Sequence, residues 1–331
     1  MENFDKIQAK KTFNKIGWFY LLGTALVIAV QYIMIFILRA FLPDVMNDGN
    51  AYLLFTYMPL FIIAYPIFIF VVTRMPKAKT IEEHKMSVGQ VLVAFIMCYS
   101  LMYIGNILGS IINMLGSLIK GSTIDNPLVE VVMDTNPLVQ LFVMVIGAPI
   151  FEEFIFRKLL IDRVIKYGEG LSILLSAFIF AMFHGNISQG IYAFALGAFL
   201  AFIYIRTGRI RYTMTLHMMI NFMGSILSGS IMKLIDIQTM TKLMQEDMSA
   251  YLNWATENAG VILLVAGYML CLAIITITGI ILWIVFRKKF YLKPTEMSIP
   301  KKEGFKVVMC NAGMICFTII WAGMYVVSFI V

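Results

Sequence analysis

Charge is scarce in this sequence. Only 14% of its 331 residues are charged, against about 25% in a typical soluble domain. Hydrophobic residues make up 60% of the chain, and the mean hydropathy is +0.86. A soluble fold of this size cannot bury so much apolar surface, and the same composition excludes a disordered chain, a coiled coil and a small disulfide scaffold. The sequence therefore predicts a polytopic membrane protein.

Cysteine is also rare, and it does not occur in pairs. The four cysteines all lie in apolar stretches without a C-x-x-C motif, at Cys98, Cys271, Cys310 and Cys316. This placement excludes a zinc knuckle and a disulfide framework, and it predicts small buried apolar side chains.

Nine apolar runs are long enough to be candidate membrane spans, which need about 20 residues each. They are residues 17–38, 53–73, 88–119, 138–160, 171–184, 187–205, 212–232, 260–286 and 307–331. The runs are unbroken, which predicts helices and excludes the alternation of a membrane barrel. We therefore expect an all-α transmembrane bundle of about eight or nine spans. The first run has no small-residue cleavage site after it and is expected to be a retained span.

Positive charge is distributed unevenly between the loops. Of the 26 Lys and Arg residues, 22 lie in five segments, the N-terminus, 74–85, 157–166, 206–211 and 287–306. Such clustering follows the positive-inside rule and places the N-terminus in the cytoplasm. Short basic loops between apolar runs do not form a phosphate-binding stripe, so no nucleic-acid partner is expected.

Three other stretches lead to structural expectations. Residues 121–137 are rich in turn formers and are expected to be a solvated loop. Residues 233–259 have apolar side chains at helical spacing and predict a helix on the outer membrane surface, as a cover more than as a lid. Gly105 and Gly109 form a G-x-x-x-G pattern, which is typical of close helix packing in membranes.

Ionisable side chains inside apolar spans are costly and usually functional. Six polar residues, five of them ionisable, lie inside or at the edge of predicted spans within one window of 70 residues: Glu152, Glu153, Arg157, His184, His217 and Asn221. Their positions along three predicted helices place them in one intramembrane cavity, nearer the cytoplasmic half. Pairs four residues apart share a helix face, as in Glu153 with Arg157, Phe180 with His184, and His217 with Asn221.

These side chains suit the activation of a water molecule. Glu152 is rotated about 100° from Glu153 on the helix and is free to deprotonate water together with His184. His217 and Asn221 can donate hydrogen bonds to an oxyanion. Glu153 and Arg157 would form a supporting ion pair.

The order of the motifs resembles the CPBP family of intramembrane proteases, also called Abi, which includes type II CAAX prenyl proteases and bacteriocin-processing enzymes. The family pattern E-E-x-x-x-R, F-x-x-x-H and H-x-x-x-N stands here as Glu152-Glu153-Phe-Ile-Phe-Arg157, Phe180-Ala-Met-Phe-His184 and His217-Met-Met-Ile-Asn221. The resemblance covers about residues 138–230. It implies peptide-bond hydrolysis in a conical cavity that opens to the cytoplasm, with Glu152 as base and His217 and Asn221 as oxyanion donors. Lys158 stands where the family often has glycine.

Several alternatives stay open. Zinc held by Glu152, His184 and His217 is chemically reasonable, although the favoured mechanism needs no cofactor. H-E-x-x-H, G-x-S-G and G-x-G-D motifs of other intramembrane proteases are absent from the sequence. The polar cluster could instead be purely structural, or it could serve a bacteriocin-immunity or transport protein that cleaves nothing. Pro149, in Gly147-Ala-Pro149, either interrupts a transport helix or kinks the helix to direct Glu152 into the cavity.

We therefore divide the chain into N-terminal spans (1–137), a catalytic core (138–232) and an outer amphipathic segment with the last spans (233–331). The expected activity is that of an intramembrane endopeptidase that cuts near the cytoplasmic side of a bacterial plasma membrane. Its expected partners are a peptide or membrane-protein substrate and the lipid bilayer. The sequence leaves the oligomeric state and the identity of the substrate undetermined.

Overall fold

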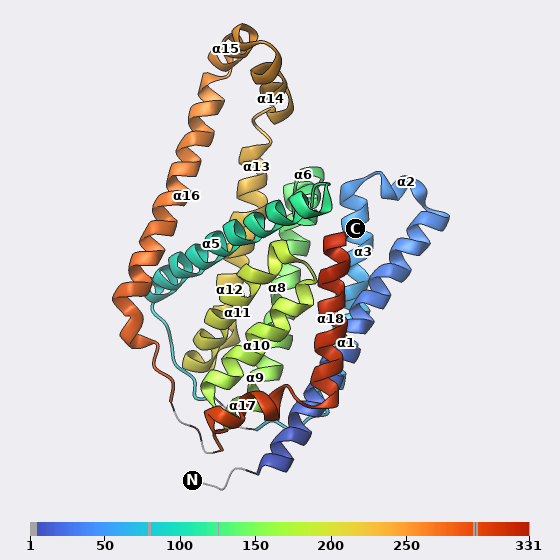
Figure 1. The fold of residues 1–331 in the computed structure, drawn as a ribbon, viewed down its shortest axis with the longest axis vertical. Coiled ribbons are helices and arrows are strands. Elements are labelled where there is room, and N and C mark those ends of the chain that lie inside the picture. The colour runs from blue at the N-terminus through green and yellow to red at the C-terminus, as the bar shows by residue number, and fades with distance from the viewer. Residues whose placement is uncertain (1–4, 79–80, 125, 294, 296, 331) are drawn as a thin grey trace.

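The fold is an all-α bundle. In the computed structural model, 86% of the residues are helical. The structure describes residues 5–78, 81–124, 126–293, 295 and 297–330, and this part of the chain contains no strand. The predicted all-α, polytopic architecture is confirmed (Figure 1).

The described residues contain seven helical segments that are long and apolar enough to cross a membrane. Three are single helices near the N-terminus or in the core: α1 (Lys6–Phe41), α5 (Val88–Lys120) and α11 (Ile187–Thr207). Two are single helices near the C-terminus: α16 (Ala259–Phe286), continued by η6 (Arg287–Lys289), and α18 (Ala312–Ile330). One is composite, with α3 (Gly49–Pro59), η1 (Leu60–Ala64) and α4 (Tyr65–Thr73).

The seventh long segment, residues 137–167, is the most irregular. It consists of α7 (Pro137–Gln140), η2 (Leu141–Gly147), α8 (Ala148–Glu153), η3 (Phe154–Leu159), α9 (Leu160–Val164) and η4 (Ile165–Tyr167). Both η2 and η3 are π-helical, and π segments often mark functional sites.

An eighth candidate span is bent by 52° against the helix that follows it. It comprises α12 (Ile210–Asn221), η5 (Phe222–Leu227) and α13 (Ser228–Met232), followed by α14 (Ile237–Glu246). The expected span at 171–184 corresponds to α10 (Glu169–His184), which has only 16 residues. Each of the nine expected segments contains a helix, although the ninth is broken at residues 309–311, before α18 begins. Helix length and composition support seven spans, or up to eight.

The expected solvated loop at 121–137 contains a helix, α6 (Pro127–Asp134). Its turn-forming residues are in fact helix caps. The Asn126 side chain accepts a hydrogen bond from the backbone of Leu128, and Asn136 caps α7 in the same way through Leu138. Asparagine at the N-cap followed by proline is a helix start signal, so the prediction of a loop was wrong. Asp125, within the same segment, lies outside the described residues.

The expected single surface helix at 233–259 is two helices, α14 and α15 (Met248–Glu257). The break is at Asp247, whose carboxylate accepts a hydrogen bond from the backbone of Ser249 at 2.9 Å. An N-cap aspartate competes with continuation of the preceding helix. Figure 1 shows that α14 and α15 project beyond the rest of the bundle.

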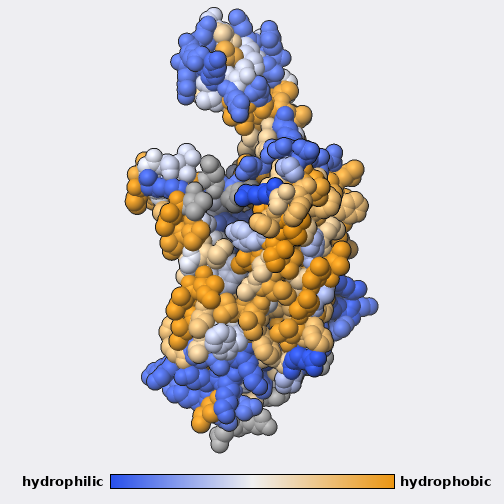
Figure 2. Space-filling view, turned by 90° about the vertical axis from the view of Figure 1, so that its right-hand side faces the viewer, coloured by the Kyte–Doolittle hydropathy of each residue, from blue (hydrophilic) through white to orange (hydrophobic). Residues whose placement is uncertain are grey.

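Figure 2 shows an apolar band between two hydrophilic ends of the bundle, and the sequence shows that these ends differ in charge. The basic end carries the N-terminus, the basic loops and α17 (Lys301–Val308). The acidic end carries α2 (Pro43–Met46), α6, α14 and α15 (Figure 1). Among the described residues of the acidic end, eight are acidic, Asp44, Asp48, Glu130, Asp134, Asp236, Glu246, Asp247 and Glu257, against four basic ones, Arg39, Lys120, Lys233 and Lys242.

The glycine pattern on α5 acts as predicted. A Cβ atom at Gly105 would lie 2.6 Å from the Cα of Tyr192, and one at Gly109 would lie 3.1 Å from the carbonyl oxygen of Ser188. α5 and α11 therefore pack backbone to backbone. All four cysteines are free, and Cys98 is buried as expected, whereas Cys271 and Cys310 are exposed on the bundle surface.

Candidate active site

The irregular helical segment 137–167 begins the site. In η2 each backbone N–H bonds to the carbonyl oxygen five residues earlier, as Ala148 does to Val143. Pro149 has no N–H group, so the next carbonyl in this pattern, that of Met144, receives no bond from it. This carbonyl instead accepts a hydrogen bond from Nδ2 of Asn221 at 2.8 Å. The break that Pro149 introduces is thus stabilised by a residue of the third motif, and α12 is fixed against the helix that carries both glutamates.

Glu153 and Arg157 form a completely buried ion pair. The Arg157 Nε atom lies 3.2 Å from Oε2 of Glu153, and both side chains have zero exposure. The guanidinium also donates to Oγ of Ser176 at 3.1 Å and lies over the Phe180 ring at 4.4 Å. Ser176 in turn donates to the carbonyl of Phe156 at 2.7 Å. These contacts offset part of the cost of burying two charges, and among the described residues Nη2 of Arg157 has no hydrogen-bond partner.

His217 lies between the two adjacent glutamates. Its Nδ1 atom is 3.0 Å from Oε1 of Glu153, and its Nε2 atom is 3.7 Å from Oε2 of Glu152. The ring is almost fully buried and packs edge-on against Phe180 at a centroid distance of 5.8 Å. The carboxylate of Glu153 thus orients the imidazole, as a carboxylate does in many catalytic and metal-binding histidine sites.

Glu152 differs from Glu153 in its access to the cavity. Its side chain is 13% exposed, compared with zero for Glu153. We predicted that Glu152 would pair with His184, but among the described residues its ion-pair contact is to His217. Adjacent residues on a helix point about 100° apart, so the Glu153 side chain points into the protein and the Glu152 side chain into the cavity. This explains their different exposure.

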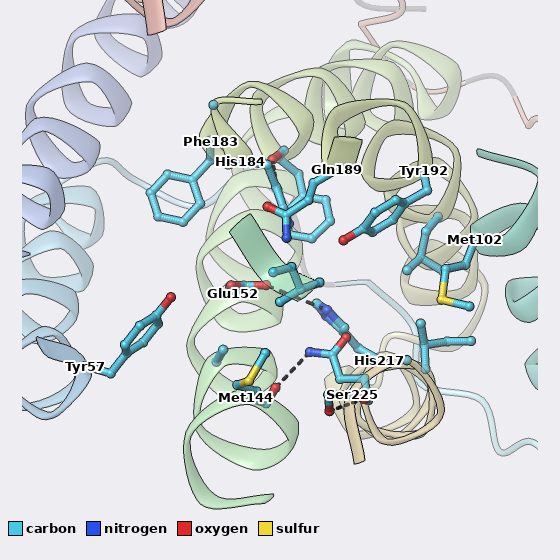
Figure 3. A pocket seen from close by; sticks show the side chains of 18 of the residues that line it. Tyr57, Met102, Met144, Glu152, Phe183, His184, Gln189, Tyr192, His217 and Ser225 are labelled. Atoms are coloured by element: carbon cyan, nitrogen blue, oxygen red, sulfur yellow. Dashed lines mark hydrogen bonds and ion pairs between the residues drawn. The ribbon is translucent and has the colours of Figure 1, made fainter. Parts of the chain in front are cut away.

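His184 lies at the last residue of α10. Its Nδ1 atom is 2.9 Å from the carbonyl oxygen of Phe180. A carbonyl oxygen can only accept, so Nδ1 carries a proton and Nε2 is left for other partners. The helix ends directly afterwards at Gly185, where φ is +65°. Figure 3 shows His184, Glu152 and His217 around one pocket.

This pocket is a cavity of about 630 Å³. All four residues predicted to be catalytic line it, namely Glu152, His184, His217 and Asn221, together with Phe180. Glu153 and Arg157 are absent from the described lining and lie behind Glu152. The lining residues come from helices throughout the chain, including α1, α5 and α18. The cavity thus involves more than the predicted core at 138–232.

Several lining residues were not found from the sequence. Gln189 and Tyr192 approach the pocket from α11, and Tyr57 from α3 (Figure 3). Ser176 lies four residues before Phe180, so helical spacing could have indicated it as a partner of Arg157. Tyr57 had no such signal, because its place in the cavity depends on the packing of distant helices.

The described residues contain no group of three or more His, Cys, Asp or Glu side chains arranged to hold a metal ion. In the observed arrangement, Glu152, His184 and His217 therefore do not fit a metal site. Zinc binding by these three residues stays a prediction, and the mechanism proposed below includes no step at a metal.

Residues 134–223 match the model of the family described as type II CAAX prenyl endopeptidase Rce1-like. This confirms the CPBP family resemblance. The matched range includes all three motifs and every residue of the site that the sequence predicted. Comparison of the chain with curated proteins and with solved structures finds no match. The family match supports a CAAX-type intramembrane protease in general terms.

Proposed function

We propose that the protein is an intramembrane endopeptidase in which Glu152 activates a water molecule. The observation that carries this proposal is the different placement of the two adjacent glutamates. The Glu153 side chain is fully buried and pairs with Arg157 and His217. The Glu152 side chain lies beside His217 and is exposed to the cavity. A general base must reach its substrate, and of the two glutamates only Glu152 does.

In the proposed reaction, Glu152 accepts a proton as water attacks the peptide carbonyl carbon. A carbon–oxygen bond forms, and negative charge develops on the carbonyl oxygen. Glu152 then returns the proton to the nitrogen of the breaking carbon–nitrogen bond. The products are a carboxylic acid and an amine, so all atoms of the water molecule are accounted for.

Two side chains are placed to stabilise the oxyanion. One amide hydrogen of Asn221 bonds to the carbonyl of Met144, and its second hydrogen is available to the substrate. The Nδ1–H group of His217 donates a hydrogen bond to Oε1 of Glu153, so Nε2 can also donate only when the ring is doubly protonated.

The test is a comparison of peptide termini in the native host. Strains would express wild type, Glu152→Gln, His184→Ala or, as a matched control, Glu82→Gln in the exposed basic loop. We expect new termini with the wild type and the control, and a loss of about 100-fold or more with Glu152→Gln. The same termini with Glu152→Gln at matched expression would refute the mechanism.

A second result would favour the other interpretation of the site. Unchanged termini, together with a toxin-resistance phenotype that survives both Glu152→Gln and His184→Ala, would indicate an immunity or transport protein. Removal of metal ions by dialysis against a chelator separates the two chemistries of a protease. The proposed reaction continues without metal, whereas a loss that zinc reverses would show a zinc enzyme.

The proposed substrate is a peptide or a membrane protein, and the proposed location is a bacterial plasma membrane with a cytoplasmic N-terminus. The concentration of Lys and Arg at one end of the bundle supports this orientation. Cleavage near the cytoplasmic side stays a prediction.

A further inference from the structure

The cavity is closed toward the basic end. In the segment that carries the glutamates, every residue from 153 to 165 is buried except Phe154 and Lys158. In the preceding twelve residues, 141–152, only Val143, Val145 and Pro149 are buried. The boundary between the two parts lies at Glu152, so this residue forms part of the cavity floor.

Polar contacts reinforce the closed side. Asp162 is almost fully buried and pairs with Lys158 at 3.0 Å and with the Tyr204 hydroxyl at 2.6 Å. The described parts of the segment after α4, residues 74–78 and 81–87, hold this layer from the basic end through two backbone hydrogen bonds. The backbone N–H of Ala78 donates to the carbonyl of Asp162 at 2.8 Å, and that of His84 donates to the carbonyl of Thr207 at 2.9 Å. A peptide cannot reach Glu152 from this end without unpacking the layer.

In the opposite direction the cavity continues. Among its lining residues are Gln31 and Tyr32 near the end of α1, Asn106 on α5 and Leu128 on α6. Tyr32 is 61% exposed, so the cavity reaches the surface there. Figure 2 shows the body hollowed in its upper half, toward the acidic end. The resemblance implied a cavity that opens to the cytoplasm, whereas the lining leads away from the basic loops.

The charge of the cavity restricts what it can bind. Among the described lining residues, Glu152 is the one carboxylate, and neither Lys nor Arg occurs. A substrate with a free C-terminal carboxylate near the scissile bond would find no Lys or Arg side chain in the described lining to pair with, at a high cost of desolvation. The mouth lies at the end where acidic residues outnumber basic ones by eight to four among the described residues. Such a field attracts cationic chains.

The walls are apolar with aromatic rings. Six tyrosines line the cavity: Tyr32, Tyr57, Tyr65, Tyr99, Tyr103 and Tyr192. Tyrosine provides an apolar face together with one hydroxyl group, and its ring also attracts Lys and Arg side chains. These walls suit an apolar peptide segment that carries positive charge.

We propose that the substrate enters from the acidic end as an apolar, cationic peptide segment without a carboxylate near the scissile bond. With the N-terminus in the cytoplasm, this end faces away from the cytoplasm. The proposed side of access stands on the packing around Glu152 alone. The proposed substrate class rests on the peptidase function argued above.

The side of access is tested by cysteine labelling in full-length protein. Single cysteines would replace Asn106 or Gln31 in the cavity, or Lys85 in the basic loop, in a background without the four native cysteines. Intact and inverted vesicles would be treated with a membrane-impermeant maleimide. We expect Asn106→Cys and Gln31→Cys to react from the side opposite to the one that labels Lys85→Cys, whichever side of the vesicle that is.

Labelling of both cavity cysteines from the same side as Lys85→Cys would overturn the proposal, and so would protection from both sides. The readout needs no catalysis, so it also gives an answer if the protein is not a protease. Correct folding of each variant would be checked by its unfolding temperature.

The substrate class is tested with two apolar probe peptides that differ only in carrying lysines or glutamates. We expect the lysine peptide to slow labelling of Asn106→Cys at least about fivefold more than the glutamate peptide at low ionic strength, with less difference at high salt. Equal protection, or stronger protection by the glutamate peptide, would refute the charge preference and leave the side of access intact. Cleavage of these peptides in the wild type would test the peptidase function separately.

Discussion

The two halves of the glutamate-bearing segment differ in packing although they belong to one continuous helical element. Toward the basic end, Arg157 and its neighbours are buried and held by ion pairs and hydrogen bonds. Toward the acidic end, the segment is interrupted by Pro149 and lines the cavity with Met144, Ala148 and Glu152. Glu152 lies where the two halves meet. The comparison indicates that the closed half contributes mainly to stability and the open half to binding and reaction.

The largest expected effect of this difference is at Arg157. The Arg157→Ala substitution leaves the charge of Glu153 buried without its main partner, which typically costs about 3–5 kcal/mol. Chemical denaturation in mixed micelles would measure the loss. Gln31→Ala on α1, where Gln31 lines the cavity, is the control. Solvent in the cavity can fill the space, and we expect a change within about 0.5 kcal/mol. Equal losses for both variants would contradict the division into two halves.

The contact between α5 and α11 tests whether the cavity beside the open half has a rigid wall. Gly105→Leu would place a side chain against the backbone of Tyr192. A Cβ atom at position 105 alone would lie only 2.6 Å from the Cα atom of Tyr192. Overpacking of this kind costs about 1–3 kcal/mol. Gly267→Leu on α16 is the matched control, because no atom lies within 4 Å of its Cβ position. If both variants unfold at the same temperature as wild type, close packing at Gly105 is not required.

Asn221 bonds to the open half of the glutamate-bearing segment, at the carbonyl of Met144, and stabilises the helix where Pro149 interrupts it. Asn221→Ala leaves the carbonyl of Met144 without its partner, with an expected loss of about 1–2 kcal/mol in the free energy of unfolding. Ser225→Ala removes only the hydroxyl that donates to the carbonyl of Asn221 at 2.6 Å, and a smaller loss is expected. If the stability of Asn221→Ala equals that of wild type while cleavage is lost, the amide acts in the reaction alone.

The smallest effect is expected at the surface of the basic end. The Lys6 ammonium lies 2.6 Å from Glu303 and, by hydrogen bonding to the carboxylate, lowers the pKa of Glu303. The pair thus stabilises the folded state above the ordinary pKa of a glutamate, and this contribution is lost as the pH falls through the lowered value. We expect Glu303→Gln to unfold at a slightly lower temperature than wild type at neutral pH, and at the same temperature in strong acid. A difference that persists in acid would exclude the ion pair as its cause.

Local rules predicted much of the site. The pairing of Glu153 with Arg157 follows from their spacing of four residues on one helix, and the structure contains this ion pair. The G-x-x-x-G pattern likewise indicated the close approach at Gly105. Prediction failed where one capping residue ended a helix, as at Asp247, because periodicity alone does not show which side chain competes for the backbone.

The contacts of His217 illustrate what could not be predicted. His217 and Glu153 are 64 residues apart, and nothing in their local sequences indicates that they meet. The same applies to Asn221 and the carbonyl of Met144. These contacts depend on how α12 packs against a helix that is distant in sequence, so they follow from the arrangement of the whole bundle.

The sequence by itself determined that this protein is an all-helical membrane bundle and which polar residues stand in its apolar helices, since hydropathy and helical spacing are local properties. Only the tertiary structure decided which partner each histidine has, which distant helices line the cavity and toward which end it opens. The physical reason is that burial and access depend on the packing of helices from all parts of the chain around Glu152.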